Sequence, residues 1–158
     1  MSNITYHEGN LFDAPKGSLL VHSCNCQGVW GAGIARTFKE RNPGIYEAYQ
    51  KYCDDNGVEQ SLGHSVILTA SGDPDTVGCL MTSGGGSHSL VDPPDTILKY
   101  TDMALTFLEW QMQKFDMVKD KEIHMPQINA GIFKVPWEKT EELLLKHNRL
   151  HFNIWVYK

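Results

Sequence analysis

The sequence has few positive charges and no long apolar run. It carries 14 Lys and Arg against 19 Asp and Glu, a formal net charge of −5 over 158 residues. Proteins that bind nucleic-acid backbones normally show the opposite balance. No stretch approaches the roughly 18 apolar residues that span a bilayer, and no basic N-terminal region precedes an apolar one. We therefore expect no nucleic-acid or membrane partner and a cytoplasmic location, with the nucleus as an additional one.

Cysteine is also scarce, and its spacing does not complete a metal site. His22, Cys24 and Cys26 alternate, so on an extended chain they would share one face. They could form half of a metal site, but no second Cys/His pair at zinc spacing follows. The alternative is a set of small buried side chains at the end of a core strand. We expect no metal, no cofactor and reduced thiols.

The remaining pattern alternates strand and helix, which predicts one α/β domain over residues 1–158 with a sheet covered on both faces. Leu19, Leu20 and Val21 form an unbroken apolar run that suits a doubly buried strand. Strands are expected over residues 4–7, 18–23, 65–70, 76–83, 122–125 and 151–157. Helices are expected over 33–41 and 45–56, from an N-cap at Asp95, and over 137–147, with Gly57 closing the second.

Two glycine-rich turns, at residues 25–35 and 128–133, each follow an expected strand and lead into a possible helix. Glycine lets the backbone approach a ligand closely, and free N–H groups at a helix start attract an anion. Arg36 stands where a dinucleotide-binding fingerprint has its third glycine, and no phosphate-binding Gly-Lys-Ser/Thr follows. The turns predict a phosphate or pyrophosphate held from two sides, although a tight turn needed only for packing stays open for the first. Asn25 and Asn129 suit ribose hydroxyls.

At this point the residues resemble a known family. The ordered set that carries the resemblance is Gly9-Asn10-Leu11-Phe12, Leu20-Val21-His22-Ser23-Cys24-Asn25, Gly31-Ala32-Gly33-Ile34-Ala35 and Met125-Pro126-Gln127-Ile128-Asn129-Ala130-Gly131-Ile132-Phe133. It resembles the macrodomain pattern over the whole chain. Within that family, the stretch from His22 to Cys26 with Trp30, together with residues 125–137, looks most like the fungal ADP-ribose 1″-phosphate phosphatases.

The resemblance implies a three-layer α/β/α sandwich with a mixed sheet of about six strands that binds ADP-ribose. Gly9, Asn10 and Leu11 would lie at the adenine, and Ser23, Cys24 and Asn25 would meet the distal ribose. Two segments would wrap the pyrophosphate and distal ribose from opposite sides: Trp30, Gly31, Ala32, Gly33, Ile34 and Ala35, and Ile128, Asn129, Ala130, Gly131, Ile132, Phe133 and Lys134. The family's usual residue at position 10 is aspartate, so Asn10 would bind adenine without charge.

Another branch of the family removes ADP-ribose from proteins with a lysine and an aspartate. The segment 82–88 offers no lysine, and Phe133 stands where the aspartate would follow the second turn. By elimination, the resemblance implies a metal-independent phosphatase that hydrolyses ADP-ribose 1″-phosphate to ADP-ribose and phosphate. A non-catalytic ADP-ribose-binding module and a hydrolase for protein-linked ADP-ribose remain the alternatives. We expect a monomer whose partner is the small-molecule substrate.

Candidate catalytic residues are His22, Asn25 and His88. Asn25 would orient the distal ribose, the loop from Ser83 to His88 would close near the terminal phosphate, and the two histidines could move protons. His22 could equally be a hydrogen-bonded core histidine, and His88 a solvated one. Trp30 could shield the distal end of the ligand or serve as a packing lid.

A nucleophilic cysteine ranks below attack by water. Cys24 or Cys26 would need a lowered pKa, and the Cys-x5-Arg loop of cysteine phosphatases is absent because Trp30 lies six places after Cys24. The other histidines are expected to be structural or solvent-facing: His7, His64, His124, His147 and His151.

Overall fold

A mixed sheet of six strands forms the centre of the structure, a computed structural model that describes residues 2–85 and 91–157. The strands are β1 (Ile4–Glu8), β2 (Leu19–Asn25), β3 (Ser65–Leu68), β4 (Thr76–Ser83), β5 (Ile123–Pro126) and β6 (Phe152–Val156). Their order is β1-β6-β5-β2-β4-β3. Every neighbouring pair is parallel except β3 and β4, so the predicted mixed sheet is confirmed.

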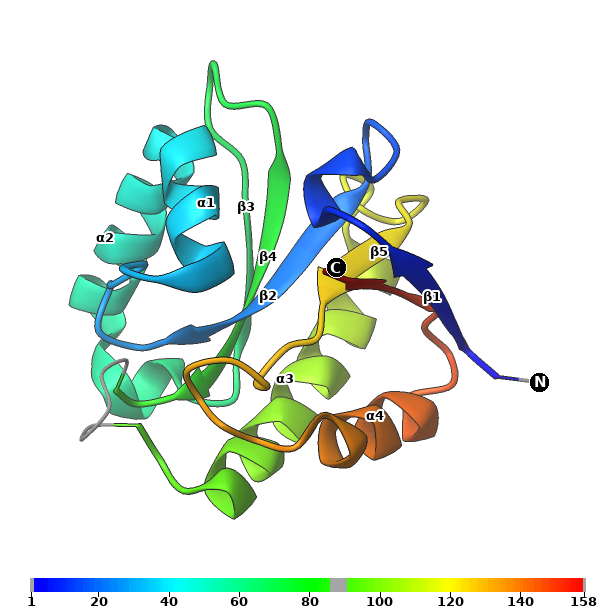
Figure 1. Cartoon of the computed structure of the whole chain (residues 1–158). Helices are drawn as coiled ribbons and strands as arrows, with labels where there is room; N and C mark the ends of the chain where they lie inside the picture. Colours follow the sequence, from blue (N-terminus) through cyan, green and yellow to red (C-terminus); the bar gives the residue numbers. More distant parts are fainter. Residues whose placement is uncertain (1, 86–90, 158) are drawn as a thin grey trace.

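Two pairs of helices cover the two faces of this sheet (Figure 1). The helices α1 (Gly33–Arg41) and α2 (Pro43–Ser61) pack on one face, and α3 (Pro94–Lys114) and α4 (Trp137–Lys146) pack on the other. A short 3₁₀ helix, η1 (Leu11–Asp13), follows β1. This arrangement confirms the predicted three-layer sandwich.

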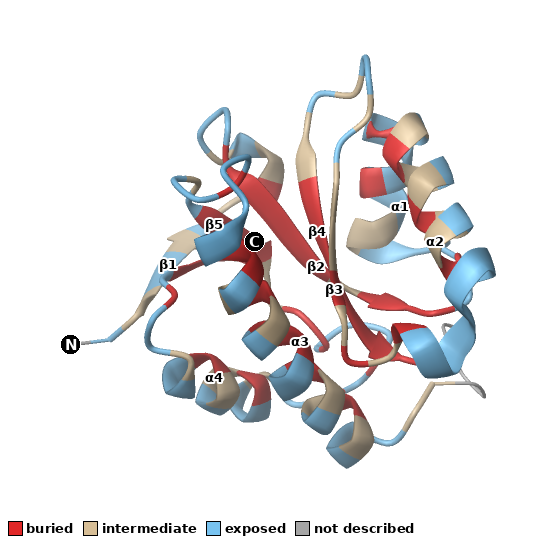
Figure 2. Ribbon diagram, turned by 180° about the vertical axis from the view of Figure 1, so that it is seen from behind, coloured by how far each residue is buried: buried red, intermediate tan, exposed pale blue. Residues whose placement is uncertain are grey.

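The strand β2 shows why an unbroken apolar run was expected there. Leu19 and Val21 point into the core beneath α3, and Leu20 points into the core beneath α1 and α2. Alternate side chains of a strand face opposite sides, so a strand between two helical layers needs apolar residues at every position. Figure 2 shows β2 and β4 buried along most of their length, while the outer faces of the helices are exposed.

Two predicted helix ends differ from the structure. Gly57 does interrupt α2, with φ of +72°, but helical structure resumes and ends at Ser61. Asp95 is not an N-cap: α3 starts at Pro94, and its N-cap is Pro93, whose side chain forms no capping hydrogen bond. Proline favours the first helical position because that N–H has no intrahelical partner. Asp95 instead lies within the first turn, where its charge suits the helix dipole.

The topology places three turns at one edge of the sheet. Because β2, β4 and β5 are parallel neighbours, their carboxyl ends lie together, and α1, α3 and α4 each begin after one of them. The two predicted glycine turns, at residues 25–35 and 128–133, therefore lie at the same edge as the start of α3. We call this edge, beyond the carboxyl ends of β2, β4 and β5, the ligand edge, because open α/β sheets bind ligands at this position. Among the described residues, no helix is long and apolar enough to cross a membrane.

Candidate functional site

The first glycine turn is held in shape by Asn25 at the end of β2. Its Oδ1 accepts the N–H of Gln27 at 2.9 Å and that of Val29 at 3.3 Å, and its Nδ2 donates to the Val29 carbonyl at 2.6 Å. The Tyr49 hydroxyl of α2 donates to the Asn25 carbonyl at 2.6 Å. The amide that we expected to orient a ribose is thus bonded to the protein, and its clear effect is to position the turn.

The second turn depends on Asn129 in the same way. This buried residue has φ of +65°, a left-handed conformation that asparagine tolerates better than most residues. Its Oδ1 accepts the Thr82 hydroxyl at 3.1 Å, and its Nδ2 donates to the Thr101 hydroxyl at 3.0 Å. Its backbone N–H donates to Ser23 Oγ at 3.0 Å. Asn129 thereby joins β2, β4 and α3 beneath the turn.

Three helices begin at the ligand edge; Asp95 and Glu138 lie in the first turns of α3 and α4, and only α1 starts without an acidic residue. The N-cap residues of α1, α3 and α4 form no capping hydrogen bond through their side chains, which leaves first-turn N–H groups available to a ligand. Each N-terminus carries roughly half a positive charge. The helix α1 has no acidic residue in its first turn, and Arg36 and Lys134 are exposed in these segments. An anion is favoured here although the net charge of the chain is negative.

The predicted binding residues divide by exposure. Those whose backbone or side chain is accessible at the edge are Gly9, Asn10, Ser23, Gly31, Ala32, Gly33, Ile34, Ala35, Ala130, Gly131, Ile132 and Lys134. Those that are buried are Leu11, Cys24, Asn25, Trp30, Ile128, Asn129 and Phe133. The second group can shape the turns but presents little side chain to a ligand.

Trp30 and Phe133 illustrate the buried group. The Trp30 ring is stacked on Tyr49 with centroids 4.6 Å apart and is only 1% exposed, which favours the packing alternative. Phe133 packs against Ile97 and Val135 beneath the second turn. A large aromatic ring under each turn keeps its backbone in place.

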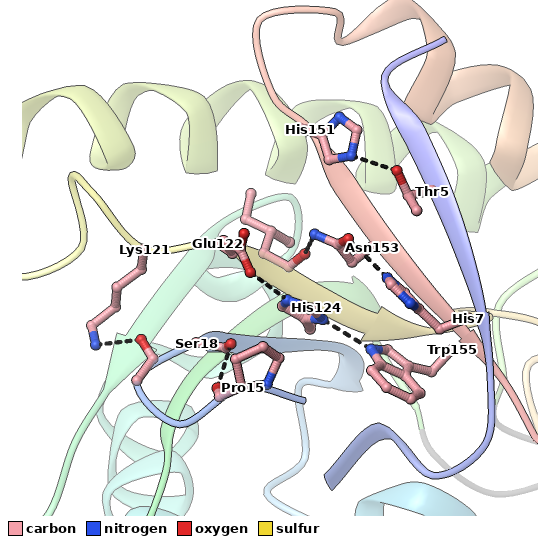
Figure 3. A network of polar contacts seen from close by, with 12 residues as sticks. Thr5, His7, Pro15, Ser18, Lys121, Glu122, His124, His151, Asn153 and Trp155 are labelled. Atoms are coloured by element: carbon pink, nitrogen blue, oxygen red, sulfur yellow. Dashed lines mark hydrogen bonds and ion pairs between the residues drawn. The ribbon is translucent and has the colours of Figure 1, made fainter. Parts of the chain in front are cut away.

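At the end of β1, the backbone is supported by a network of ring contacts and hydrogen bonds (Figure 3). Gly9 has φ of +132°, and a Cβ there would lie 3.7 Å from the Trp155 ring. Trp155 stacks on His7 and donates its indole N–H to His124 Nδ1 at 2.9 Å. This nitrogen accepts, so the proton of His124 is on Nε2, which donates to Glu122 at 3.1 Å. The network positions the predicted adenine end.

Asn10 already uses its carbonyl. Its Oδ1 accepts the Phe12 N–H at 2.9 Å and caps η1. A second lone pair on this oxygen can still face a ligand.

Comparison with known proteins agrees with this geometry. The family model described as Macro domain matches residues 21–144. The chain belongs to the macro domain family. The chain is 35% identical to the ADP-ribose 1″-phosphate phosphatase of Debaryomyces hansenii, with 97% of this chain and 98% of the relative covered. It is 37% identical to the protein of that name from Candida glabrata, with 100% and 99% covered.

Solved structures show the same fold. The macrodomain of Mycobacterium tuberculosis DarG superposes with a TM-score of 0.76 at 24% identity, covering 98% of this chain and 96% of that one. Thermosipho africanus DarTG in complex with ADP-ribose gives a TM-score of 0.72 at 18% identity, covering 99% of this chain and 42% of that one. The resemblance found in the sequence is confirmed.

The two predicted catalytic histidines of this macro domain have different outcomes. His88 lies outside the described residues, so its role stays a prediction. His22 is 1% exposed and stacks on Phe38 with centroids 4.1 Å apart. Burial lowers the pKa of His22 to about 3, so the imidazole is neutral at physiological pH. A direct proton transfer would require access that this packing does not provide, and the structure favours the core alternative.

The cysteines near the ligand edge are poor nucleophiles. Burial raises the pKa of the Cys24 thiol well above its ordinary value and raises the pKa of Cys26 to about 12. Both are therefore protonated at neutral pH, which agrees with the lower rank given to cysteine attack.

Most of the other histidines have structural partners, as expected. The side-chain N–H₂ group of Asn153 donates to the Ile123 carbonyl, so Asn153 Oδ1 is left as an acceptor. His7 therefore donates its Nε2–H to this oxygen at 2.9 Å. His147 pairs with Asp102, and His151 with Thr5. His64 is in edge contact with Phe107, and its Nδ1 has no partner among the described residues.

Asp92 is a residue at this edge that the sequence analysis missed. Its Oδ2 accepts the Gly84 N–H at 2.8 Å, and its own N–H donates to Ser83 Oγ at 3.2 Å. The carboxylate therefore lies just beyond β4, and its charge also acts on the nearby Cys26. No motif points to it, because an isolated aspartate before two prolines resembles an ordinary loop residue.

Proposed function

We propose that this macro domain hydrolyses ADP-ribose 1″-phosphate to ADP-ribose and phosphate without a metal ion. The proposal rests chiefly on the fungal relatives of that name, which are 35–37% identical over nearly their whole length. The uncapped helix starts and exposed turn backbones supply the physical basis for holding a diphosphate.

In this proposal the adenosine lies toward Gly9 and Asn10, above Trp155. The diphosphate lies over the first turn of α1, between the exposed backbones of Gly33 and Gly131. The distal ribose then lies near Ser23, and its 1″-phosphate extends toward the carboxyl end of β4. The helix dipoles that hold the diphosphate also stabilise charge on the transferring phosphoryl group, where positioning and electrostatics supply most of the catalysis.

The chemistry requires a group that takes a proton from water. We propose Asp92 for this role because the Gly84 N–H fixes one of its oxygens at the rim of the site. The water oxygen forms a bond to phosphorus as its proton passes to the carboxylate. The bond from phosphorus to O1″ then breaks, and the proton that Asp92 received passes to O1″, which gives the ribose hydroxyl and restores the carboxylate. A positioned general base contributes about 10²–10⁴-fold to the rate.

Release of inorganic phosphate from ADP-ribose 1″-phosphate tests this function. We expect turnover by the wild type that survives EDTA, together with ADP-ribose binding by calorimetry. Tight ADP-ribose binding without phosphate release would refute the phosphatase proposal and identify a binding module. Release of ADP-ribose from a modified protein, with no action on the phosphate ester, would instead identify the protein-linked hydrolase.

A further inference from the structure

All four cysteines of the chain gather in one buried cluster, although they come from different elements. Cys24, Cys26, Cys53 and Cys79 all line the core beneath α1 and α2. Two of them lie beside a histidine: the donor atoms of His22, Cys24 and Cys79 lie within 4.8 Å of one another. Each of these three residues is at most 2% exposed.

The register of the sheet creates this group. His22 on β2 is the direct partner of Cys79 on β4, and Cys24 is two residues further along β2. Residues two apart on a strand share a face, and so do directly paired residues on neighbouring strands. The three side chains therefore converge, and the shortest recorded contact joins His22 Nε2 to Cys24 Sγ at 3.4 Å.

His22 is poorly satisfied for a buried polar side chain. Its two ring nitrogens have Cys24 Sγ as their recorded hydrogen-bond partner within the described residues, at 3.4 and 3.8 Å. Sulfur is a weak donor and acceptor, whereas buried imidazole nitrogens normally have oxygen or nitrogen partners. Trp30 and Phe38 contact the ring through their aromatic faces or edges, and no recorded hydrogen bond joins either of them to His22 among the described residues.

We propose that His22, Cys24 and Cys79 form a binding site for a single thiophilic metal ion, with Cu(I) as the best-fitting ion. Two thiolate sulfurs are soft donors that select Cu(I) or Zn(II), and an imidazole nitrogen suits either of these metals. Structural zinc almost always has four ligands, and the donor group here has three members with no carboxylate. The buried surroundings provide no exposed position for a water ligand, which favours the ion of lower coordination number.

The dimensions of the group suit such an ion. Metal–sulfur bonds of about 2.3 Å place two donors of a trigonal site about 4 Å apart. The donor atoms of the three residues lie within 4.8 Å of one another, so any pair of donors needs to move closer by less than about 1 Å to bind the ion. Binding displaces thiol protons and gives the His22 nitrogen the partner that it lacks. The ion stabilises the core beneath the first turn and takes no part in the proposed hydrolysis.

Anaerobic titration of the reduced protein with Cu(I), against a chromophoric competing chelator, tests the site. We expect one Cu(I) per chain, and at least a tenfold loss of affinity in Cys79→Ser, since even indirect ligand partners contribute about 10–100-fold. The matched control is Cys53→Ser, which removes a buried thiol of the same cluster that lies outside the donor group. Circular dichroism checks that both variants fold.

X-ray absorption on the copper-loaded wild type tests the donors without any variant. Two sulfur neighbours and one nitrogen neighbour support the proposal. It is overturned if the chelator removes all copper, if Cys53→Ser loses as much affinity as Cys79→Ser, or if fewer than two sulfurs surround the metal. Four-coordinate Zn(II) bound more tightly than Cu(I) would overturn the choice of ion.

Discussion

The replacement Asn129→Ala tests most directly how the second turn is built. The variant removes the acceptor of the buried Thr82 hydroxyl and the amide donor to Thr101. A buried hydroxyl left without a partner costs about 1–3 kcal/mol, and the second lost bond adds about 1 kcal/mol. Alanine at φ of +65° adds about 1 kcal/mol of strain. The free energy of unfolding should therefore fall by about 3–5 kcal/mol.

Urea denaturation followed by tryptophan fluorescence measures this change. Asn129→Gly loses the same bonds but accepts the left-handed backbone, so it should be about 1 kcal/mol more stable than Asn129→Ala. Gln111→Ala is the matched control: it removes a buried amide on α3 that donates to the Ser65 carbonyl on β3, away from the second turn. All three variants should lose stability, but only the two at position 129 should lose ADP-ribose affinity.

Two results would refute the reasoning about Asn129. A loss of less than about 1 kcal/mol in Asn129→Ala would mean that its hydrogen bonds are replaced by water or by neighbouring groups. Unchanged ADP-ribose affinity in a folded Asn129 variant would mean that the turn does not need this support to bind its ligand.

Three further predictions concern the ligand edge and the core. Gly33→Ala and Gly17→Ala both place a Cβ in open space at positive φ, so both variants should lose about 1–2 kcal/mol of stability. Calorimetry should show weaker ADP-ribose binding only for Gly33→Ala. Equal binding by both variants would contradict the placement of the diphosphate. Asp92→Asn should lower kcat for phosphate release by about 10²–10⁴-fold with ADP-ribose affinity retained, whereas Asp116→Asn, an exposed aspartate just after the C-terminal end of α3, should leave kcat within about twofold of wild type. Full activity of Asp92→Asn would exclude it as the base. Burial lowers the pKa of His22 to about 3, so the unfolded chain takes up a proton below about pH 6.5 that the folded one does not. The contribution of neutral His22 to the free energy of unfolding is thus complete above that pH and falls toward pH 3, by up to about 1.4 kcal/mol per pH unit. In His22→Gln, denaturation at a series of pH values should show a dependence of the free energy of unfolding on pH that is smaller by one proton.

Several features could be read from local sequence alone. The run Leu19 to Val21 predicted a doubly buried strand because each side of it meets a helical layer. The glycine turns predicted backbone that can approach an anion, and α1 does begin at Gly33 without a side-chain cap. Element types were predicted well for the same reason: periodicity and turn residues act over a few positions.

The roles of individual polar residues were harder to predict. Asn25 and Asn129 were correctly placed at the turns, but their amides bind the protein. Residue type shows that an amide can bond a ribose, but whether it is available depends on the groups packed beside it. Asp92 was missed because the importance of its carboxylate comes from the Gly84 N–H after β4.

The sequence by itself determined where strands, helices and anion-accepting turns would form, since each depends on neighbouring residues. Only the tertiary structure decided which of these segments meet. Parallel pairing brought the ends of β2, β4 and β5 to one edge, and the register of β2 on β4 placed Cys79 beside His22 across 57 positions of sequence. The spacing of residues along the chain does not show which strands pair, because pairing is set by the packing of the whole sheet between its two helical layers.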